Sequence, residues 1–469
     1  MTTWRQRLAR RAYSLLLRLL VPAYLLRLWW RGRAEPLYRH AIAERLGAYR
    51  GEPGSGWVWV HAVSLGETRA AAALVDALRV LRPGLRLLLT HSTATGREAG
   101  LALLREGDRQ AWLPYDSGAV VKRFFARFRP AIGVLMETEV WPNLLRAAHA
   151  NAVPMVLANA RLSVRSAARG QRLDALLRPA ARSLALVLAQ SDADAQRLRA
   201  AGAAEVEVSG NLKYDLTPDP AQLALGAAWR LRLNRAVVLA AITREGEEAM
   251  LLAAWRAQSG PRPLLLIVPR HPQRFDAVAA LVRNAGLTLA RRSEWGDTPP
   301  AEAGSADVWL GDSMREMALY YACAQVALLG GSFETLGGHN LIEAAACGCP
   351  LVMGPSSFNF AEAAALSLAA GASERVADMA GGVALAIAWL ADAPALAQRA
   401  RDASTFAAQH RGAAQRMALR IVALLPPAAS ATTSASASAT ASASASATAS
   451  ASASPSPRPS SGAKPTRGS

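Results

Sequence analysis

The stretch from Gly330 to Glu343, which reads GGSFETLGGHNLIE, has the residue types of an anion-binding loop. It follows the apolar run Val326–Leu329 and precedes the helical pattern of Leu341–Cys347, so it predicts a glycine-rich connection from a strand to a helix. Such a connection exposes unpaired backbone N–H groups at a helix start, where they and the helix dipole stabilise anions. The glycine spacing differs from that of the dinucleotide fingerprint and of the P-loop. We therefore expect a nucleotide-linked phosphate here, but neither NAD nor a nucleoside triphosphate.

Glu67 has two explanations that the sequence leaves open. Ser64-Leu-Gly-Glu67 matches the S-x-x-E capping box, and an alanine-rich helical pattern over Thr68–Leu81 follows it directly. Capping alone would account for this glutamate. A glutamate at a helix start is also stabilised as an anion, and if it faces a cleft it can take a proton from a hydroxyl group.

Two acidic pairs also have residue types that could do chemistry. Glu137-Thr-Glu139 follows an apolar run with no evident structural need for two acids, which favours a functional role. Asp192-Ala-Asp194 resembles the D-x-D metal motif of some sugar transferases. Because Ser191 and Asp194 also form a capping box before a helical pattern, we favour the structural interpretation of this second pair.

Basic groups are placed at similar points of the chain. Four histidines lie in segments just after predicted strands: His61, His91, His271 and His339. The chain has only three lysines among many arginines, and one of them is Lys213 in the segment Gly210–Asp215. A compact ammonium favours a point-charge contact to an anion, although chance explains this lysine equally well.

The elements that must position these residues are short apolar runs alternating with longer helical patterns. The first series of predicted strands is Trp57–Val60, Leu85–Thr90, Ile132–Met136, Met155–Ala158 and Leu184–Ala189. The second series is Val237–Ala241, Leu264–Val268, Val308–Leu310, Val326–Leu329 and Leu351–Met353. Such alternation is typical of an α/β fold whose parallel sheets bind ligands at the carboxyl ends of the strands. We expect two Rossmann-like domains, residues 51–215 and 216–427, with a cleft between them.

Composition excludes several classes of protein. The 469 residues carry a net charge of +18, but residues 1–50 hold eleven arginines against Glu35 and Glu44, and the chain after Ala428 holds three cations and no acid. Twelve of the eighteen net charges are therefore terminal, and no basic stripe on the folded part indicates nucleic-acid binding. The three cysteines have no metal-ligand spacing and argue against a disulfide scaffold.

Both ends of the chain differ from the middle. Residues 1–50 include Tyr13–Trp30, an apolar stretch flanked by arginines and interrupted by Arg18, Pro22 and Arg27. This pattern predicts a membrane-associated helix on anionic lipid, either spanning the bilayer or lying on it. The alternative is a helix packed on the protein's own core. Residues 428–469 form an Ala/Ser/Thr-rich repeat, which predicts a disordered tail.

Eight motifs in order, within roughly residues 30 to 420, resemble the bacterial 3-deoxy-D-manno-octulosonic acid (Kdo) transferases. They are His61–Glu67 (HAVSLGE), Met136–Asn143 (METEVWPN), Asn159–Ser163 (NARLS), Gly210–Asp215 (GNLKYD), Pro269–Pro272 (PRHP), Gly330–Glu343, Gly354-Pro355 and Asn359-Phe360. Any one of these motifs is weak evidence, but their order along the chain is specific.

The resemblance implies a GT-B glycosyltransferase at the cytoplasmic face of the inner membrane. Such enzymes transfer Kdo from CMP-Kdo to a lipid A precursor with inversion, and need no metal or further cofactor. By analogy Glu67 is the base, and Glu137 or Glu139 assists it. The acceptor side is expected to include Ser64, Gly66, Ser92, Thr95 and Arg161. The nucleotide sugar is expected to contact Lys213, Arg270, His271, Gly331, Ser332, Gly337, Gly338, His339, Asn340 and Glu343.

The chain departs from the family pattern mainly in its nucleotide-binding half. Arg244 stands where a histidine is usual, Arg315 replaces a glycine, Ala344 replaces a proline, and Ser356 replaces a histidine. Three alternatives stay open at this point: a GT-B transferase that uses a UDP-sugar, a sugar-nucleotide epimerase, and a non-catalytic membrane-surface protein.

Overall fold

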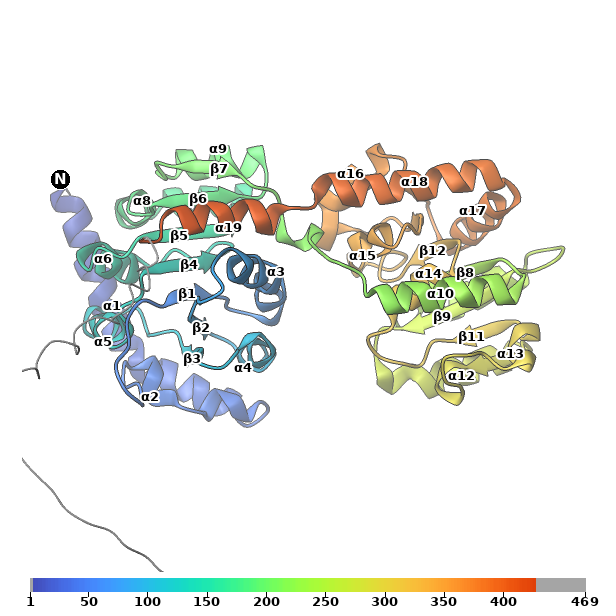
Figure 1. Cartoon of the computed structure of the whole chain (residues 1–469), viewed down its shortest axis with the longest axis horizontal. Helices are drawn as coiled ribbons and strands as arrows, with labels where there is room; N and C mark the ends of the chain where they lie inside the picture. The colour runs from blue at the N-terminus through green and yellow to red at the C-terminus, as the bar shows by residue number, and fades with distance from the viewer. Residues whose placement is uncertain (1–2, 427–469) are drawn as a thin grey trace, which may run out of the picture. The chain divides into compact units, whose positions relative to one another are not determined.

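The computed structural model describes residues 3–426, and these contain two seven-stranded sheets (Figure 1). Every strand pair in both sheets is parallel. The predicted α/β class with two Rossmann-like halves is therefore confirmed. We call them the N-terminal and C-terminal lobes. The predicted disordered tail, residues 428–469, lies outside the described part of the chain.

The N-terminal sheet has the strand order β3-β2-β1-β4-β5-β6-β7. Its strands are β1 (Val58–His61), β2 (Leu87–His91), β3 (Arg109–Trp112), β4 (Ile132–Met136), β5 (Met155–Ala160), β6 (Leu186–Ala189) and β7 (Val206–Val208). The C-terminal sheet has the order β10-β11-β9-β8-β12-β13-β14. Its strands are β8 (Val237–Thr243), β9 (Leu264–Pro269), β10 (Leu289–Arg291), β11 (Val308–Leu310), β12 (Val326–Leu329), β13 (Leu351–Met353) and β14 (Ser373–Arg375).

Helices cover both faces of each sheet (Figure 1). Those before the C-terminal sheet are α1 (Trp4–Arg31), α2 (Ile42–Arg45), α3 (Leu65–Leu81), α4 (Ala94–Gly100), α5 (Gly118–Phe128), α6 (Pro142–Ala150), α7 (Val164–Gln171), α8 (Asp174–Arg182), α9 (Asp192–Ala200) and α10 (Pro220–Leu233). The others are α11 (Glu247–Arg256), α12 (Phe275–Asn284), α13 (Ala301–Ser305), α14 (Met317–Cys323), α15 (Leu341–Ala346), α16 (Ala361–Ala369), α17 (Met379–Ala391), α18 (Ala393–His410) and α19 (Ala413–Ala423).

The central strands are apolar throughout because both of their faces are buried. In β1, Trp59 packs into the core beneath α5 and α6, whereas Val58 and Val60 pack into the core beneath α3. Successive side chains of a strand point to opposite faces, so each central strand must supply apolar groups to two cores. This requirement explains why the sequence shows unbroken apolar runs where these strands form.

Each sheet has one pair of neighbouring strands from which the chain continues toward opposite edges of the sheet. In the N-terminal sheet this pair is β1 and β4, and in the C-terminal sheet it is β8 and β12. The loops that leave such a pair of strands diverge to opposite faces of the sheet and open a crevice for ligands. The segments that begin there are Ala62–Glu67 after β1, Glu137–Trp141 after β4, Arg244–Gly246 after β8 and the Gly330 loop after β12.

The last described helix returns to the N-terminal lobe. Met417 and Ile421 of α19 are fully buried in the core that also contains α3. Asp215 accepts hydrogen bonds from the backbone N–H groups of Gly412 and Ala414 at the start of this helix. The core of the N-terminal lobe thus includes residues from within the predicted segment 216–427, a packing that the sequence did not reveal.

Helix α1 is docked along the N-terminal lobe by polar contacts. The Tyr13 hydroxyl donates to Asp116 Oδ2 at 2.9 Å, and Ser14 Oγ donates to Asn143 Oδ1 at 3.2 Å. The Tyr115 hydroxyl donates to the carbonyl oxygen of Leu17 at 3.0 Å. By length and composition α1 could also cross a membrane, although little of it is buried. The helix is therefore attached to the folded lobe over more than one turn.

Candidate active site

Glu67 lies in the first turn of α3, at the switch point of the N-terminal sheet. The strand β1 ends at His61, and the chain turns through Val63 so that Ser64 becomes the N-cap of α3. Ser64 Oγ accepts from the Glu67 N–H at 3.4 Å and donates to Glu67 Oε1 at 3.1 Å. The other carboxylate oxygen of Glu67 accepts from the backbone N–H of Val63 at 2.8 Å. The predicted capping arrangement is thus present.

Capping does not remove the chemical role, because the carboxyl group is poised for proton exchange. Burial raises the pKa of Glu67 to about 7, opposed by the hydrogen bonds from Val63 and Ser64 and reinforced by Glu137 and Glu139. A general base works best when its pKa lies near the working pH. Glu67 therefore combines a fixed position at a helix start with the proton affinity of a base at neutral pH.

Glu137 and Glu139 follow β4, next to β1 in the sheet. Glu137 has φ of 59°, a left-handed conformation that is uncommon for a glutamate and is found more often at functional sites. Glu139 Oε2 accepts a hydrogen bond from the indole N–H of Trp141 at 2.6 Å. Burial and the nearby Glu137 raise the pKa of Glu139. Glu67, Glu137 and Glu139 thus form one group of carboxylates whose charges act on one another.

A neutral histidine lies beneath this group. His61 is fully buried, and burial together with the nearby His91 lowers its pKa to about 3. Its Nδ1 lies 3.0 Å from both the carbonyl oxygen and the hydroxyl oxygen of Thr90. Its Nε2 lies 4.0 Å from Glu139 Oε2. No positive charge from His61 therefore neutralises the carboxylates at neutral pH.

The residues predicted on the acceptor side are spread around these carboxylates. Ser64 bonds Glu67 directly, and Gly66 is exposed in the same helical turn. Arg161 follows β5, and its backbone N–H donates to the carbonyl oxygen of Glu137 at 3.3 Å. The backbone N–H of Ser92 donates to Val63 at 3.3 Å. Thr95 lines a different cavity, of about 540 Å³, together with Leu37 and Glu98. Its acceptor role stays a prediction.

In the C-terminal lobe, a buried carboxylate that the sequence did not single out shapes the glycine-rich loop. Glu247, at the start of α11, is fully buried and accepts backbone N–H groups of Gly331 at 2.8 Å, Arg244 at 2.9 Å and Phe333 at 3.2 Å. Gly331 has φ of 71°, and a Cβ there would approach His339 to 3.2 Å. The loop after β12 is therefore tied to the segment after β8. Two adjacent acids following a predicted strand were the signal that could have found Glu247.

The rest of the loop is organised by its own hydrogen bonds. Ser332 Oγ accepts from the Gly354 N–H at 2.8 Å, and the Gly338 N–H donates to the carbonyl oxygen of Gly331 at 2.8 Å. Gly337 has φ of 83°, and its N–H donates to Ser356 Oγ at 3.0 Å. Asn340 caps α15 by accepting from the Ile342 N–H at 3.2 Å. Ser356, one of the departures from the family pattern, thus contributes to the loop's structure.

Basic groups surround His339 in this loop. Burial lowers the pKa of His339 to about 4, and Arg270, Arg244 and His271 lower it further. Its Nε2 is buried and has no hydrogen-bond partner within residues 3–426. Arg270 and His271 directly follow β9, and both are exposed. Basic side chains around a buried hydrogen-bonding group form a suitable binding site for an anion such as a phosphate.

Lys213 and Glu343 were also predicted to contact the nucleotide sugar, and their neighbours in the structure are as follows. Lys213 lies in the 3₁₀ turn η3 (Leu212–Tyr214), with its Nζ 5.6 Å from the centroid of the Phe360 ring. Glu343 lies in α15, where burial raises its pKa and Arg69 opposes the rise. Their roles toward a nucleotide stay predictions.

The remaining sequence interpretations can be judged from local geometry. Ser191 is the N-cap of α9, and its Oγ accepts from the Asp194 N–H at 3.2 Å and donates to Asp194 Oδ2 at 2.7 Å, so the capping interpretation of Asp192-Ala-Asp194 is confirmed. Arg315 has φ of 67°, a conformation that favours glycine, where the related family usually has glycine. This departure leaves local backbone strain beside Glu316.

Comparison with known proteins places these features in one family. A family model described as 3-deoxy-D-manno-octulosonic-acid transferase (kdotransferase) matches residues 40–216. A 3-deoxy-D-manno-octulosonic acid transferase of Bordetella pertussis is 47% identical over 424 residues, which cover 87% of this chain and 98% of the relative. The transferase of the same name from Haemophilus influenzae is 36% identical over 337 residues, which cover 70% of this chain and 78% of the relative.

Solved structures share the fold at low sequence identity. A glycosyltransferase from Rickettsia africae has a TM-score of 0.52 and 12% identity, and the match covers 78% of this chain and 97% of that one. The UDP-GlcNAc 2-epimerase from Neisseria meningitidis has a TM-score of 0.51 and 15% identity, with coverage of 78% and 99%. Because a transferase and an epimerase both match, the fold alone does not choose between these activities.

The buried position of Glu247 generates a prediction about stability. Glu247→Gln should lower the free energy of unfolding by about 1–3 kcal/mol, because an amide has one acceptor oxygen where three backbone N–H groups need partners. Denaturant unfolding measures this change, and Glu245→Gln, at an exposed side chain, should stay within about 0.5 kcal/mol of the wild type. Equal stability of the two variants would contradict this role of Glu247.

Proposed function

This chain belongs to the 3-deoxy-D-manno-octulosonic acid transferase family, and from that premise we propose that it transfers Kdo from CMP-Kdo to a lipid A precursor in lipopolysaccharide synthesis. The main support is the 47% identity with a transferase of that name, which extends over nearly all of the relative's length. The group of carboxylates around Glu67 then supplies a proton acceptor, and the basic groups around His339 supply an anion site.

In the proposed reaction Glu67 takes the proton of an acceptor sugar hydroxyl. The oxygen attacks the anomeric carbon of Kdo from the face opposite the nucleotide, and a new C–O bond forms. The bond between that carbon and the CMP phosphate oxygen breaks, and CMP leaves with the electron pair. Attack opposite the leaving group inverts the anomeric centre. Glu137 and Glu139 assist by keeping the proton affinity of Glu67 high.

The C-terminal lobe is proposed to stabilise the leaving CMP without a metal ion. Arg270 and the N–H groups of the Gly331–Asn340 loop, together with Lys213 at the end of the N-terminal lobe, would hold the phosphate and the Kdo carboxylate. Fixed donors directed at developing charge lower the barrier without costing reorganisation. His339, neutral because of its lowered pKa, can donate or accept a hydrogen bond there. No cofactor other than CMP-Kdo as co-substrate is needed in this scheme.

A lipid acceptor is supported by an apolar cavity between α1 and the carboxylates. This cavity, of about 790 Å³, is lined by Leu16 of α1, by Glu139 and Trp141 of the segment after β4, and by Leu173 and Leu176 next to or within α8. Mostly apolar walls with a few polar groups, here including Tyr13, Glu139 and Arg172, are typical of ligand sites. An acyl chain of the acceptor would fit here while the sugar lies near Glu139.

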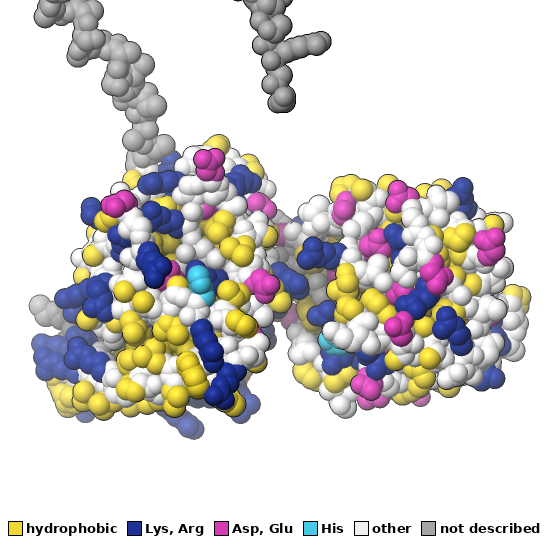
Figure 2. All heavy atoms as spheres, turned by 90° about the horizontal axis from the view of Figure 1, so that it is seen from below, with side chains coloured by type: hydrophobic (Ala, Val, Ile, Leu, Met, Phe, Trp, Pro, Cys, Tyr) yellow, Lys and Arg dark blue, Asp and Glu magenta, His cyan; other side chains and the backbone are white. Residues whose placement is uncertain are grey.

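We propose that the protein lies on the cytoplasmic face of the inner membrane and that α1 rests on the lipid rather than spanning it. Leu8, Leu15, Leu19 and Leu26 are exposed at intervals that place them on one side of the helix. The residues that dock α1 on the lobe, such as Tyr13, face the other side. Figure 2 shows hydrophobic side chains gathered on the N-terminal lobe with Lys and Arg side chains at their margin. An amphipathic helix of this kind binds at a lipid interface.

The transfer reaction itself tests the proposal. Purified full-length protein, incubated with a lipid A precursor and chelator, should add Kdo when CMP-Kdo is supplied, as measured by the mass of the lipid product. UDP-sugars should give no product. Transfer from a UDP-sugar in place of CMP-Kdo, or a requirement for a divalent metal, would contradict the proposed donor chemistry.

The raised pKa of Glu67 predicts a specific pH profile. Because the carboxylate form is the base and its pKa is about 7, kcat/KM should fall about tenfold for each pH unit below 7 and level off above it. The profile is measured in overlapping buffers at saturating donor. A profile that bends only near pH 4.5, the ordinary range of a glutamate, would show that another group limits the reaction.

A further inference from the structure

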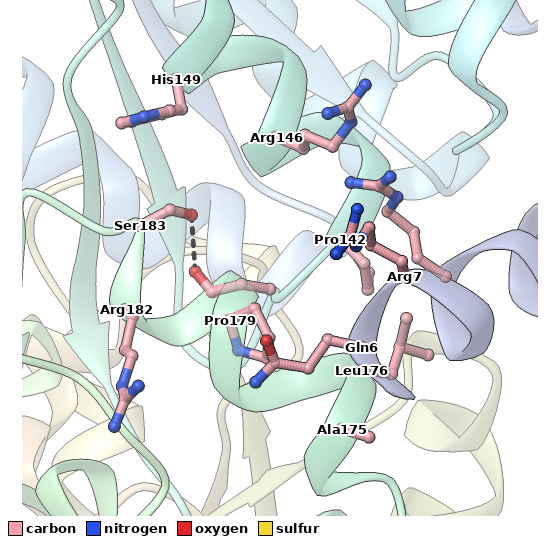
Figure 3. A pocket seen from close by; sticks show the side chains of 12 residues that line it. Gln6, Arg7, Pro142, Arg146, His149, Ala175, Leu176, Pro179, Arg182 and Ser183 are labelled. Atoms are coloured by element: carbon pink, nitrogen blue, oxygen red, sulfur yellow. Dashed lines mark hydrogen bonds between the residues drawn. The ribbon is translucent and has the colours of Figure 1, made fainter. Parts of the chain in front are cut away.

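A second cavity beside α1 is lined by basic side chains. It has a volume of about 440 Å³ and lies between α1, α6 and α8. Its basic lining residues are Arg7, Arg10, Arg146, His149 and Arg182. Figure 3 shows that Arg7, Arg146 and Arg182 come from these three different helices. Folding therefore brings together cations that are far apart in the sequence.

These cations have no carboxylate partner. Within residues 3–426, none of Arg7, Arg10, Arg146 and Arg182 forms an ion pair, whereas Arg178 on the same helix as Arg182 pairs with Asp174 at 2.8 Å. Burial, followed by Arg146 and Arg11, lowers the pKa of Arg10. Like charges gathered in a concave site raise the local potential and attract an anion.

Helix dipoles explain only part of this cluster. His149 and Arg182 lie in the last turns of α6 and α8, where a cation is favoured by the helix C-terminus. Arg7 and Arg10 lie in the first half of α1, so this explanation does not apply to them. Several guanidinium groups around one cavity fit a phosphate, which they can bind through paired N–H groups.

The arginine-lined cavity adjoins the apolar cavity that contains Glu139, because Pro142, Ala175 and Leu176 line both. Its basic side chains extend away from the carboxylates along α6, which begins at Pro142 and carries Arg146 and His149 four and seven residues further on. At 1.5 Å per residue, His149 lies about 10 Å along the helix axis from Pro142. A phosphate bound beside His149 would therefore lie further along α6 than Glu139, next to the first turns of α1.

We propose that the arginine-lined cavity binds the phosphate of an anionic membrane phospholipid, as a site distinct from the one that transfers the sugar. Its occupant is a phospholipid because the cavity adjoins the helix whose apolar side faces outward, and because these arginines form no ion pair within residues 3–426. The bound lipid fixes the orientation of the N-terminal lobe on the membrane, with the cavity at the level of the headgroups.

Binding of the full-length chain to vesicles tests this proposal. The vesicles consist of phosphatidylcholine with or without phosphatidylglycerol, and bound protein is measured by flotation. Wild-type protein should bind more tightly when phosphatidylglycerol is present. Arg146→Gln and Arg182→Gln should each weaken this binding about fivefold, the usual effect of one basic residue near an anionic surface. Soluble glycerol phosphate at the concentration of the lipid should not displace the protein.

A matched control separates the cavity from general surface charge. Arg256→Gln removes the same charge from an exposed position of α11, away from α1 and from the cavity, and should change binding less than twofold. Equal losses for Arg256→Gln and Arg146→Gln would overturn the proposal in favour of unspecific attraction. Circular dichroism of each variant checks that the fold is retained.

Two other results would also overturn it. Displacement by glycerol phosphate would assign the cavity to a soluble anion. A raised KM of Arg146→Gln for the acceptor, in detergent without phospholipid, would assign it to the acceptor lipid. Vesicle binding requires no sugar donor, so failure of the transfer reaction would leave this test unaffected.

Discussion

The parallel pairing of all strands is the constraint on which the site depends. In each sheet it brings every strand's carboxyl end to one edge, and the reversal of strand order between β1 and β4, and between β8 and β12, opens that edge to ligands. Glu67 and Glu137 come from the first pair of strands, and Glu247 and Gly331 belong to the segments after the second. One lobe thus gathers carboxylates, whereas the other presents N–H donors and basic groups.

Burial gives these groups their chemical properties. It raises the pKa of Glu67 to about 7 and lowers that of His61 to about 3. A carboxyl group of this lobe therefore binds a proton more tightly than an imidazole does, which is the reverse of the usual order. The cost of holding a carboxylate at the start of α3 is offset by hydrogen bonds from the Val63 N–H and the Ser64 hydroxyl. The same arrangement thus caps the helix and holds the carboxyl group that we propose as the base.

Much of the fold could be predicted from the sequence, because central strands need apolar residues on both faces. All ten predicted strands are present, and the four that were missed, β3, β7, β10 and β14, are the edges of the two sheets. Edge strands are only partly covered, so they lack an unbroken apolar run. The capping of Asp194 and the glycine-rich loop were local patterns and were predictable. The hydrogen bond from Gly331 to Glu247 and the return of α19 join residues far apart in the chain, so no local pattern reports these contacts, although the two adjacent acids after a predicted strand mark the position of Glu247.

The central claim is that the two lobes divide the work, with Glu67 acting on the acceptor and the C-terminal lobe binding the nucleotide. The most direct measurement compares CMP affinity and Kdo transfer in the wild type and in Glu67→Ala. We expect transfer to fall by about 10²–10⁴-fold, the usual contribution of a general base, while the Kd for CMP stays within about twofold because no described nucleotide contact is removed. Transfer that persists in Glu67→Ala would reduce this residue to a helix cap, and a parallel loss of CMP affinity would contradict the division between the lobes.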